Sequence, residues 1–566
     1  MKRISILLFL FLGTALVSAQ KEKDSVATEV INVISSYKPT ISDAFKSKDN
    51  PIIDKKDTQK KKQYYKINSK AVKSIFEPNP GAYKKVSNPR PAKIFSNYLK
   101  LGYGNYNTPL VEAFLQKKKR EHEFKFYLFN KASGGGIKDV RLNDNYLNTK
   151  IGLAYKNQQR YYSWHSKINF DRDVYNWYGL PASQNAVAIN EKQAYNTFTI
   201  AGGFDLKRGM LKNTALEIIN FSDRFKSKET QIKINPQFEF PINKNKIVTD
   251  FQLEILNGEF KTNYTDTQAI NYGQLTLGTE AYYPIKKDNL FLSLGAKIKY
   301  NSDLENKTNT FKVYPDIKID YALIEEFFNI YGGINGDLVQ NTHRGFAEQN
   351  PFISPTINFV TPTNNAYNLF VGLNGKLSSV IHYNTKATFS NEEGKALFKL
   401  NQNLSDGNSA TNQPYQYGNS FQVVYDNIKT FSLFGEISSE ISSELELGAN
   451  IEIKNYSVTL ESEAWNLPGV TSSIFADFNY GKWSANSKLF LVGKRKDVSI
   501  DHLAAETPIF LKAYVDLNLN AAYQFNTKWS AFMNLQNIFN SNYERFSNFQ
   551  VQGFQILGGF RYNFNW

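Results

Sequence analysis

The last thirteen residues of this 566-residue chain constrain its fold more than any other stretch. Every second residue from 554 to 566 is apolar or glycine, and the residues between include Gln555, Arg561, Asn563 and Asn565. A side-chain period of two over this length indicates a β-strand with one apolar and one polar face. A strand of a soluble sheet could alternate in the same way, so the rest of the chain has to decide the class. The apolar and glycine positions are Phe554, Ile556, Gly558, Phe560, Tyr562, Phe564 and Trp566.

Long alternating runs recur from about residue 96 onward. Each reaches or exceeds the ~9–11 residues that a tilted strand needs to cross a bilayer. A succession of such runs, separated by turn residues, is the signature of a transmembrane barrel. Four of these runs have the following members on one face: Leu147, Thr149, Ile151, Leu153 and Tyr155; Leu275, Leu277, Thr279, Ala281 and Tyr283; Leu445, Leu447, Ala449, Ile451 and Ile453; and Ala513, Val515, Leu517, Leu519, Ala521, Tyr523 and Phe525.

The intervening positions distinguish a barrel from a soluble β-sandwich. They include Glu446, Glu452, Lys454, Asp516 and Asn518, which a water-filled lumen would accept and a sandwich core would not. Sandwich strands also average only about five residues. We therefore predict an all-β fold, a large antiparallel transmembrane β-barrel over residues 96–566. At roughly 21 residues per strand plus connection it has about 22 strands, an even number as in bacterial barrels.

The predicted connections alternate in length. Asn526-Thr527, Ser442-Ser443 and Gly481-Lys482 join strands tightly, whereas longer connections lie around 465–470, 494–508 and 540–552. Barrels of this class have short periplasmic turns and longer external loops. The sequence therefore places both termini of the mature chain in the periplasm.

A secretory signal peptide is predicted at residues 1–19. Lys2 and Arg3 precede an apolar run over 4–17, and Ala19 ends a small-residue cleavage site. An N-terminal membrane anchor is the alternative, but this run is shorter than the ~20 residues of a spanning helix. The chain has no Cys, which excludes lipidation at cysteine, disulfides and thiolate-bound metals.

Residues 20–95 form a basic, Pro- and Lys-rich segment without sustained periodicity. The chain carries a net charge of +15, of which residues 21–95 supply +9 from 17 Lys and Arg against 8 Asp and Glu. The signal peptide adds +2, so residues 96–566 carry only +4. This distribution indicates a solvated tail and argues against a nucleic-acid groove. We expect the segment to be periplasmic or to occlude the lumen.

The C-terminal third resembles the barrel of TonB-dependent receptors. The resemblance is specific over about residues 420–566 and architectural over 96–420, and a plug domain of their size is missing, because only 76 residues, 20–95, precede the first strand. A closing aromatic strand is also similar to the signal read by barrel-assembly machinery, with Phe560, Tyr562, Phe564 and Trp566 as its members. The matching segments are Ala464-Trp465-Asn466-Leu467-Pro468-Gly469, 511–518, Asn534-Leu535-Gln536-Asn537-Ile538-Phe539-Asn540, Tyr543-Glu544, Gln552-Gly553 and 558–564.

One short segment resembles a TonB box, through which an energy-coupling protein pulls on such receptors. A stray β-prone stretch beside the signal peptide is the alternative. The absence of a plug of that size argues against energy-coupled uptake by this chain. The residues are Thr28, Glu29, Val30, Ile31, Asn32, Val33 and Ile34.

No catalytic or metal-binding constellation emerges. The five histidines, at 122, 165, 343, 382 and 502, lack zinc-ligand spacing. Asp501-His502 is the strongest catalytic candidate, but adjacent side chains diverge, which favours a solvated loop pair. Trp465 and Pro468 could form a ligand platform, although a rigid turn with an interfacial aromatic is favoured. We expect no enzyme, metal or cofactor.

Two functions remain open for an outer-membrane barrel of a Gram-negative bacterium. One is a transport conduit, or the barrel component of an outer-membrane transport system. The alternative is a non-transporting structural subunit of a complex for protein assembly or surface-lipoprotein export. Expected partners are outer-membrane lipids, the barrel-assembly machinery and, for a complex, other outer-membrane or periplasmic subunits.

Overall fold

A computed structural model describes residues 95–565 except 183, 185–188, 243–244 and 406–411. The signal peptide, the segment resembling a TonB box and Trp566 lie outside the described residues. The first strand begins at Asn97. No helix in the described part of the chain is long and apolar enough to cross a membrane.

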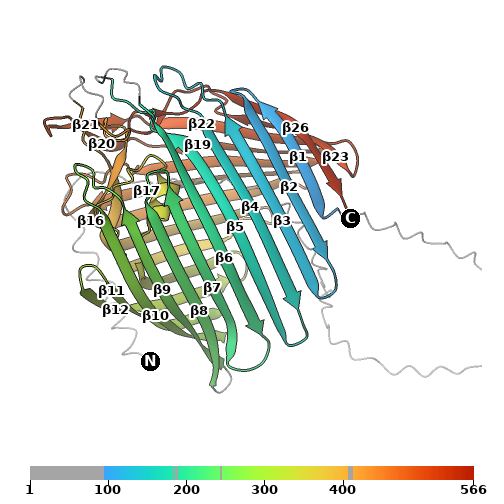
Figure 1. The fold of residues 1–566 in the computed structure, drawn as a ribbon. Coiled ribbons are helices and arrows are strands. Elements are labelled where there is room, and N and C mark those ends of the chain that lie inside the picture. Colours follow the sequence, from blue (N-terminus) through green and yellow to red (C-terminus); the bar gives the residue numbers. More distant parts are fainter. Residues whose placement is uncertain (1–94, 183, 185–188, 243–244, 406–411, 566) are drawn as a thin grey trace, which may run out of the picture. The chain divides into compact units, whose positions relative to one another are not determined.

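The described residues form strands and one short helix (Figure 1). In order, these are β1 (Asn97–Gly104), β2 (Thr108–Lys118), β3 (His122–Ser133), β4 (Tyr146–Gln158), β5 (Tyr162–Asn176), β6 (Lys192–Leu206), β7 (Leu211–Asp223), β8 (Lys228–Ile242), β9 (Asn245–Phe260), β10 (Ile270–Lys287), β11 (Leu290–Asp303), β12 (Thr308–Ile324), β13 (Phe328–Val339), α2 (His343–Gln349), β14 (Thr363–Lys376), β15 (Ile381–Leu400), β16 (Phe421–Ser442), β17 (Leu445–Ser457), β18 (Val470–Tyr480), β19 (Trp483–Val492), β20 (Arg495–Ile500), β21 (Glu506–Leu511), β22 (Tyr514–Gln524), β23 (Trp529–Gln536), β24 (Glu544–Phe546), β25 (Phe549–Gln550) and β26 (Gln555–Phe564).

Twenty-two strands pair antiparallel with their neighbours in one sheet that closes on itself. Closure comes from β1 and β26, which pair from Asn97 with Phe564 to Gly104 with Leu557. The wall consists of β1 to β19, β22, β23 and β26, while β20–β21 and β24–β25 form separate hairpins. A closed ring leaves no unpaired sheet edge, as hydrocarbon requires. The predicted fold class and strand number are confirmed.

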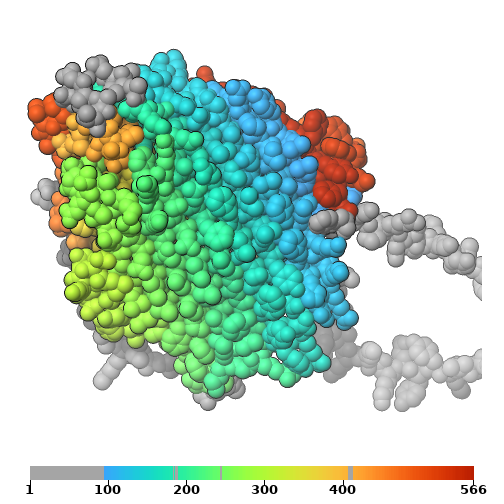
Figure 2. All heavy atoms as spheres, viewed as in Figure 1, coloured from blue at the N-terminus to red at the C-terminus, as the bar shows by residue number. Residues whose placement is uncertain are grey.

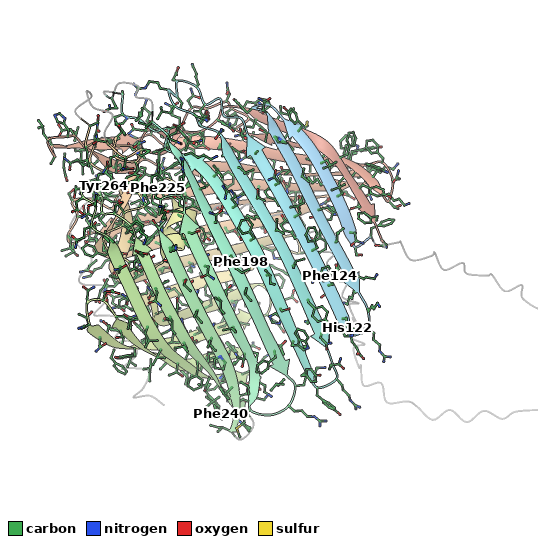
Figure 3. The ribbon with its side chains drawn as sticks, viewed as in Figure 1. His122, Phe124, Phe198, Phe225, Phe240 and Tyr264 are labelled. Atoms are coloured by element: carbon green, nitrogen blue, oxygen red, sulfur yellow. The ribbon has the colours of Figure 1, made fainter. Side chains whose placement is uncertain are left out.

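The outer face of the wall is apolar. Large side chains such as Phe311 and Phe560 are 65% and 57% exposed. Figure 3 shows Phe124 and Phe198 along the front of the wall, and Figure 2 shows the outside from β1 to β12 as one continuous surface. Such a face avoids the cost of exposing large apolar side chains only where the solvent is itself apolar.

The inner face is polar and charged, as the alternation predicts. Ile451 and Ile453 are exposed on the outside, so Glu452 and Lys454, which alternate with them, point inward, where they form an ion pair of 3.1 Å. A second network lies on β10, β11 and β13. There Lys297 Nζ lies 3.2 Å from Glu280 Oε2 and 3.6 Å from Asp337 Oδ2, and Lys299 Nζ lies 3.2 Å from Asp337 Oδ1.

The two ends of the barrel differ. At the turn end, tight turns such as 443–444 and 481–482 join strands, and the Ser96 backbone N–H donates to Asn565 beside the closing strand. At the loop end, the connections 458–469, 493–513 and 537–554 are long. The predicted alternation of tight turns and long connections is therefore confirmed.

The last strand presents its aromatic side chains on the outside. The Tyr562 ring lies 4.7 Å from that of Trp529 and 5.7 Å from that of Phe564. Phe560 belongs to the same outward row. The described members of the predicted assembly signal thus form a ladder next to the seam with β1, and their role in assembly stays a prediction.

Candidate functional site

Long connections at the loop end fold over the lumen and pack into one hydrophobic cluster, which we call the loop layer. It is built from the described parts of the connections 177–191, 261–269, 340–362, 401–420 and 537–554 and from the strand ends beside them. Figure 3 places Phe225 and Tyr264, which pack against this cluster, at the loop end. Its buried members are Trp177, Tyr195, Phe221, Leu256, Phe260, Tyr272, Phe346, Ala347, Phe352, Ile353, Ile357, Val360, Leu400, Tyr415, Phe421, Val423, Phe546 and Phe549.

The loop layer spans the mouth of the barrel. The Trp177 carbonyl, between β5 and β6, accepts a 2.8 Å hydrogen bond from Asn419 Nδ2, between β15 and β16. The strands β6 and β16 stand ten steps apart in a ring of 22, almost opposite each other. Gln184 and Ser405 join the same two connections again, at 3.3 Å. Contacts between nearly opposite strands require their connections to run across the opening.

The segment 340–362 lies at the centre of the loop layer. Trp177 Nε1 donates to the Phe352 carbonyl at 3.2 Å, and Tyr195 Oη donates to the Pro351 carbonyl at 2.9 Å. The Phe352 ring stacks on that of Phe549 with centroids 3.8 Å apart. Two other connections and the wall strand β6 therefore hold this segment.

One carboxylate of the wall anchors helix α2 in this segment. Glu229 at the start of β8 is 3% exposed and accepts from the backbone N–H groups of His343 and Arg344 at 2.6 and 3.1 Å, and from Tyr272 Oη at 2.8 Å. Thr342 caps the helix by accepting from Gly345 N at 2.9 Å. The first-turn N–H groups, which lack helical partners, are thereby satisfied from the wall and the cap.

His343 is fully buried within the loop layer. Its ring lies 4.9 Å from that of Phe221 and 4.8 Å from that of Phe260, and neither ring nitrogen has a hydrogen-bond partner among the described residues. Burial lowers the pKa of His343 to about 3, so its imidazole is neutral at pH 7. Protonation of this buried ring would therefore destabilise the packed loop layer.

The β20–β21 hairpin is fixed to the loop layer from the side. Arg495 donates to the Glu544 carbonyl at 2.6 Å, which ties the hairpin to β24. Asp497 accepts from Leu400 N at 3.3 Å and from Asn466 Nδ2 at 3.0 Å. Complete burial raises the pKa of Asp497 to about 6, against the lowering effect of these hydrogen bonds.

Asp501 and His502 lie at the exposed tip of this hairpin. Asp501 Oδ1 accepts from the backbone N–H groups of Leu503 and Ala505 at 2.9 and 2.8 Å, so it closes the turn. The His502 carbonyl accepts from Gln402 at 3.3 Å. Among the described residues no group of three His, Cys, Asp or Glu could hold a metal ion. The pair fits the solvated-loop interpretation.

Trp465 is neither a ligand platform nor an interfacial aromatic. It is 3% exposed, its Nε1 donates to Glu461 at 2.7 Å, and Lys399 Nζ lies 5.4 Å from its ring. It packs in a second cluster with Val498 and Ala464. The expectation of a rigid turn is supported, since Asn466 after it has φ of 60°, but the aromatic stabilises a loop core and does not face the membrane interface.

Sequence reasoning missed the residues that build the loop layer, including Glu229 and Phe352. A signal was present, because the connection 340–362 contains six apolar side chains that are buried in the structure, at 346, 347, 352, 353, 357 and 360. A solvated external loop has no reason to carry so many.

No family model and no curated protein matches this sequence. Solved structures match over most of the chain. The ferripyoverdine receptor of the outer membrane of Pseudomonas aeruginosa has a TM-score of 0.61 at 14% identity, covering 84% of this chain and 72% of that one. The FrpB iron transporter from Neisseria meningitidis has 0.63 at 9%, covering 84% and 82%. The ferric enterobactin receptor PfeA from Pseudomonas aeruginosa has 0.60 at 9%, covering 83% and 80%.

These likenesses establish the fold. At 9–14% identity they show that this barrel has the same architecture as the barrels of outer-membrane receptors and of an iron transporter. The architecture implied by the resemblance to TonB-dependent receptors is therefore confirmed. Cargo and partners do not follow from it.

Proposed function

We propose that this protein is an outer-membrane β-barrel of a Gram-negative bacterium and the conduit of a transport system, with the loop layer as its gate. The observation that carries the proposal is a closed ring with an apolar outside and a charged inside, whose mouth is crossed by connections. A scaffold would need no charged lumen, whereas a water-filled pathway does.

The orientation follows from the difference between the two ends. We place the tight turns and both ends of the mature chain in the periplasm and the loop layer outside the cell, as in other barrels with short turns and long loops. Residues 1–19 would act as the export signal, and barrel-assembly machinery would read the final strand. Outer-membrane lipids would cover the apolar face.

A gate requires that the loop layer can move without unfolding the wall. The wall strands are held by their own ladders, for example β8 by β7 and β9. The segment 340–362 is instead held by separate contacts to Glu229, Trp177 and Phe549. Releasing those contacts opens the mouth and leaves the ring closed, because local stability is set by local contacts.

Conductance in planar bilayers tests the proposal. The purified full chain is compared with a variant in which residues 344–360 are replaced by a short Gly/Ser linker. The wild type should show few or no steps and the variant large, frequent ones. A matched control replaces 304–307, the β11–β12 turn at the same end, which contributes nothing to the hydrophobic cluster. A loop variant without conductance steps would contradict the proposal that the barrel is a conduit.

The packed loop layer also fits the alternative of a non-transporting barrel subunit. Purification in mild detergent separates the two proposals. Stable co-purifying subunits together with a silent loop variant would favour the structural role.

A further inference from the structure

The turns of the barrel carry unequal charge around the ring. Three adjacent turns, β2–β3, β4–β5 and β6–β7, carry five basic side chains and the single acid Glu121, which accepts from Gln159. On the far arc the β12–β13 turn carries Glu325 and Glu326, of which Glu326 pairs with Lys376 Nζ at 2.9 Å, and the β16–β17 turn carries Glu444. We call the five basic residues the basic rim. They are Lys119, Arg120, Arg160, Lys207 and Arg208, and all are exposed.

The basic rim is not neutralised by the described part of the protein. None of its five side chains forms an ion pair with a carboxylate among the described residues; the nearby Glu239 is engaged by Lys246 and Lys212 at 2.7 and 3.7 Å. Neighbouring hairpins are on the order of 10 Å apart, since strands are spaced by about 4.8 Å. The rim therefore presents uncompensated positive charge along one arc of the turn end.

The rim lies at the border of the apolar face. Arg160 and Arg208 lie 5.3 and 4.4 Å from the centre of the Tyr161 ring, which is 44% exposed. Met210, in the same turn as Arg208, is 57% exposed. Exposed aromatic and apolar side chains beside cations are typical of protein surfaces at the membrane interface, where phosphate groups and hydrocarbon meet.

We propose that the basic rim binds the headgroups of anionic phospholipids in the leaflet reached by the turn end. This inference rests on the proposed insertion of the barrel in a membrane. The Tyr161 ring holds two guanidinium groups at the level of the headgroups, and each presents several donors to phosphate oxygens. On the far arc Glu325 and Glu444, which form no ion pair among the described residues, repel the same lipids. The barrel therefore carries an oriented shell of anionic lipid on the side of β2 to β7.

Continuity with the lipid-facing wall favours a lipid over an acidic protein. A protein partner would need a surface of its own at the turns, whereas a phospholipid places its chains on the apolar wall and its phosphate at the rim at once. Each cation near a charged membrane surface strengthens binding on the order of fivefold.

Lipid retention by the full chain tests the proposal. The folded barrel is purified in detergent doped with equal amounts of phosphatidylglycerol and phosphatidylcholine, and bound lipid is quantified by native mass spectrometry. Phosphatidylglycerol should be retained about tenfold over phosphatidylcholine. The variant R120Q/R160Q/R208Q should lose that preference, and 0.5 M salt should weaken it. The variant R120K/R160K/R208K keeps the charge and should keep most of the preference.

A matched control replaces three exposed lysines of the loop end with glutamine, K138Q/K226Q/K307Q, and should change nothing. Equal retention of both lipids, or an unchanged preference in the triple glutamine variant, overturns the inference. An equal loss of the preference for phosphatidylglycerol in the loop-end control overturns it too. Displacement by soluble glycerophosphate, or binding of polyglutamate without lipid preference, would assign the rim to another anion.

Heat-modifiable migration in pure phosphatidylcholine vesicles separates this inference from the function on which it rests. A barrel that does not insert there contradicts the proposed membrane role. A barrel that inserts without preferring anionic lipid contradicts only the proposed binding of lipid by the basic rim.

Discussion

Substitution of Glu229 should release the centre of the loop layer while leaving the barrel wall folded. The carboxylate accepts three hydrogen bonds, two from the backbone of α2 and one from Tyr272. Hydrogen bonds to a charged group contribute about 1.5–3 kcal/mol each, and the cost of burying the carboxylate offsets a large part of their sum. Glu229→Ala leaves all three donors buried without a partner, so we expect a loss of about 3 kcal/mol in local stability.

Hydrogen exchange measured by mass spectrometry detects this loss. The α2 amides of Phe346 and Asn350 bond to the carbonyls of Thr342 and Phe346 at 3.0 and 2.8 Å, and they exchange when the segment opens. A loss of about 3 kcal/mol accelerates their exchange by about 150-fold. Glu229→Gln retains one acceptor and should accelerate it about tenfold.

Glu254→Gln is the matched control, because Glu254 is 4% exposed and bonds to Gln231 and Gln252 without touching the loop layer. Exchange in 343–350 should stay at the wild-type rate in this control. The reasoning is refuted if Glu229→Ala leaves the α2 amides protected, or if wall peptides such as those of β10 accelerate equally.

Three further predictions concern pH, the final strand and the N-terminal segment. The pKa of His343 is lowered to about 3 in the packed loop layer, against about 6.5 in the unfolded chain, so the stability contributed by the neutral ring is complete above pH 6.5 and is lost as pH falls toward 3. At pH 5 the packed loop layer should lose about 2 kcal/mol of stability, and its amides should exchange faster. His343→Phe should remove this pH dependence. Replacing Phe564 and Trp566 with serine should lower the heat-modifiable fraction in membranes, and an unchanged yield would place the assembly signal elsewhere. Deleting residues 20–93 should raise the conductance of the loop variant further if the segment occludes the lumen; loss of a co-purifying protein would instead indicate a periplasmic partner, and neither effect would mark it as a spacer.

The wall was predictable from sequence because its determinants are local. Alternation in a run such as 445–453 specifies both faces of a strand, and antiparallel pairing through tight turns such as 481–482 fixes neighbours a few residues apart. Closure through β1 and β26 follows from the absence of any tolerable edge in lipid.

The loop layer was not predictable because its contacts are distant in sequence and have no period. Trp177 meets Asn419 across 242 residues, and Glu229 meets His343 across 114. Nothing in the local sequence of 177 or 419 specifies the other. Trp465 is an intermediate case. The rigid turn could be predicted from Pro468, but the burial of Trp465 depends on Val498, which lies in a separate hairpin.

Access to the lumen from outside the cell tests the central claim most directly. The chain has no cysteine, so Thr388→Cys gives a single thiol on the inner face of β15 below the loop layer. A membrane-impermeant maleimide added to intact cells should label it slowly in the wild-type background, and rapidly when residues 344–360 are replaced or the cells are lysed. Rapid labelling of the wild-type background would show that the mouth is open, and slow labelling of the loop variant would show that the layer does not close it.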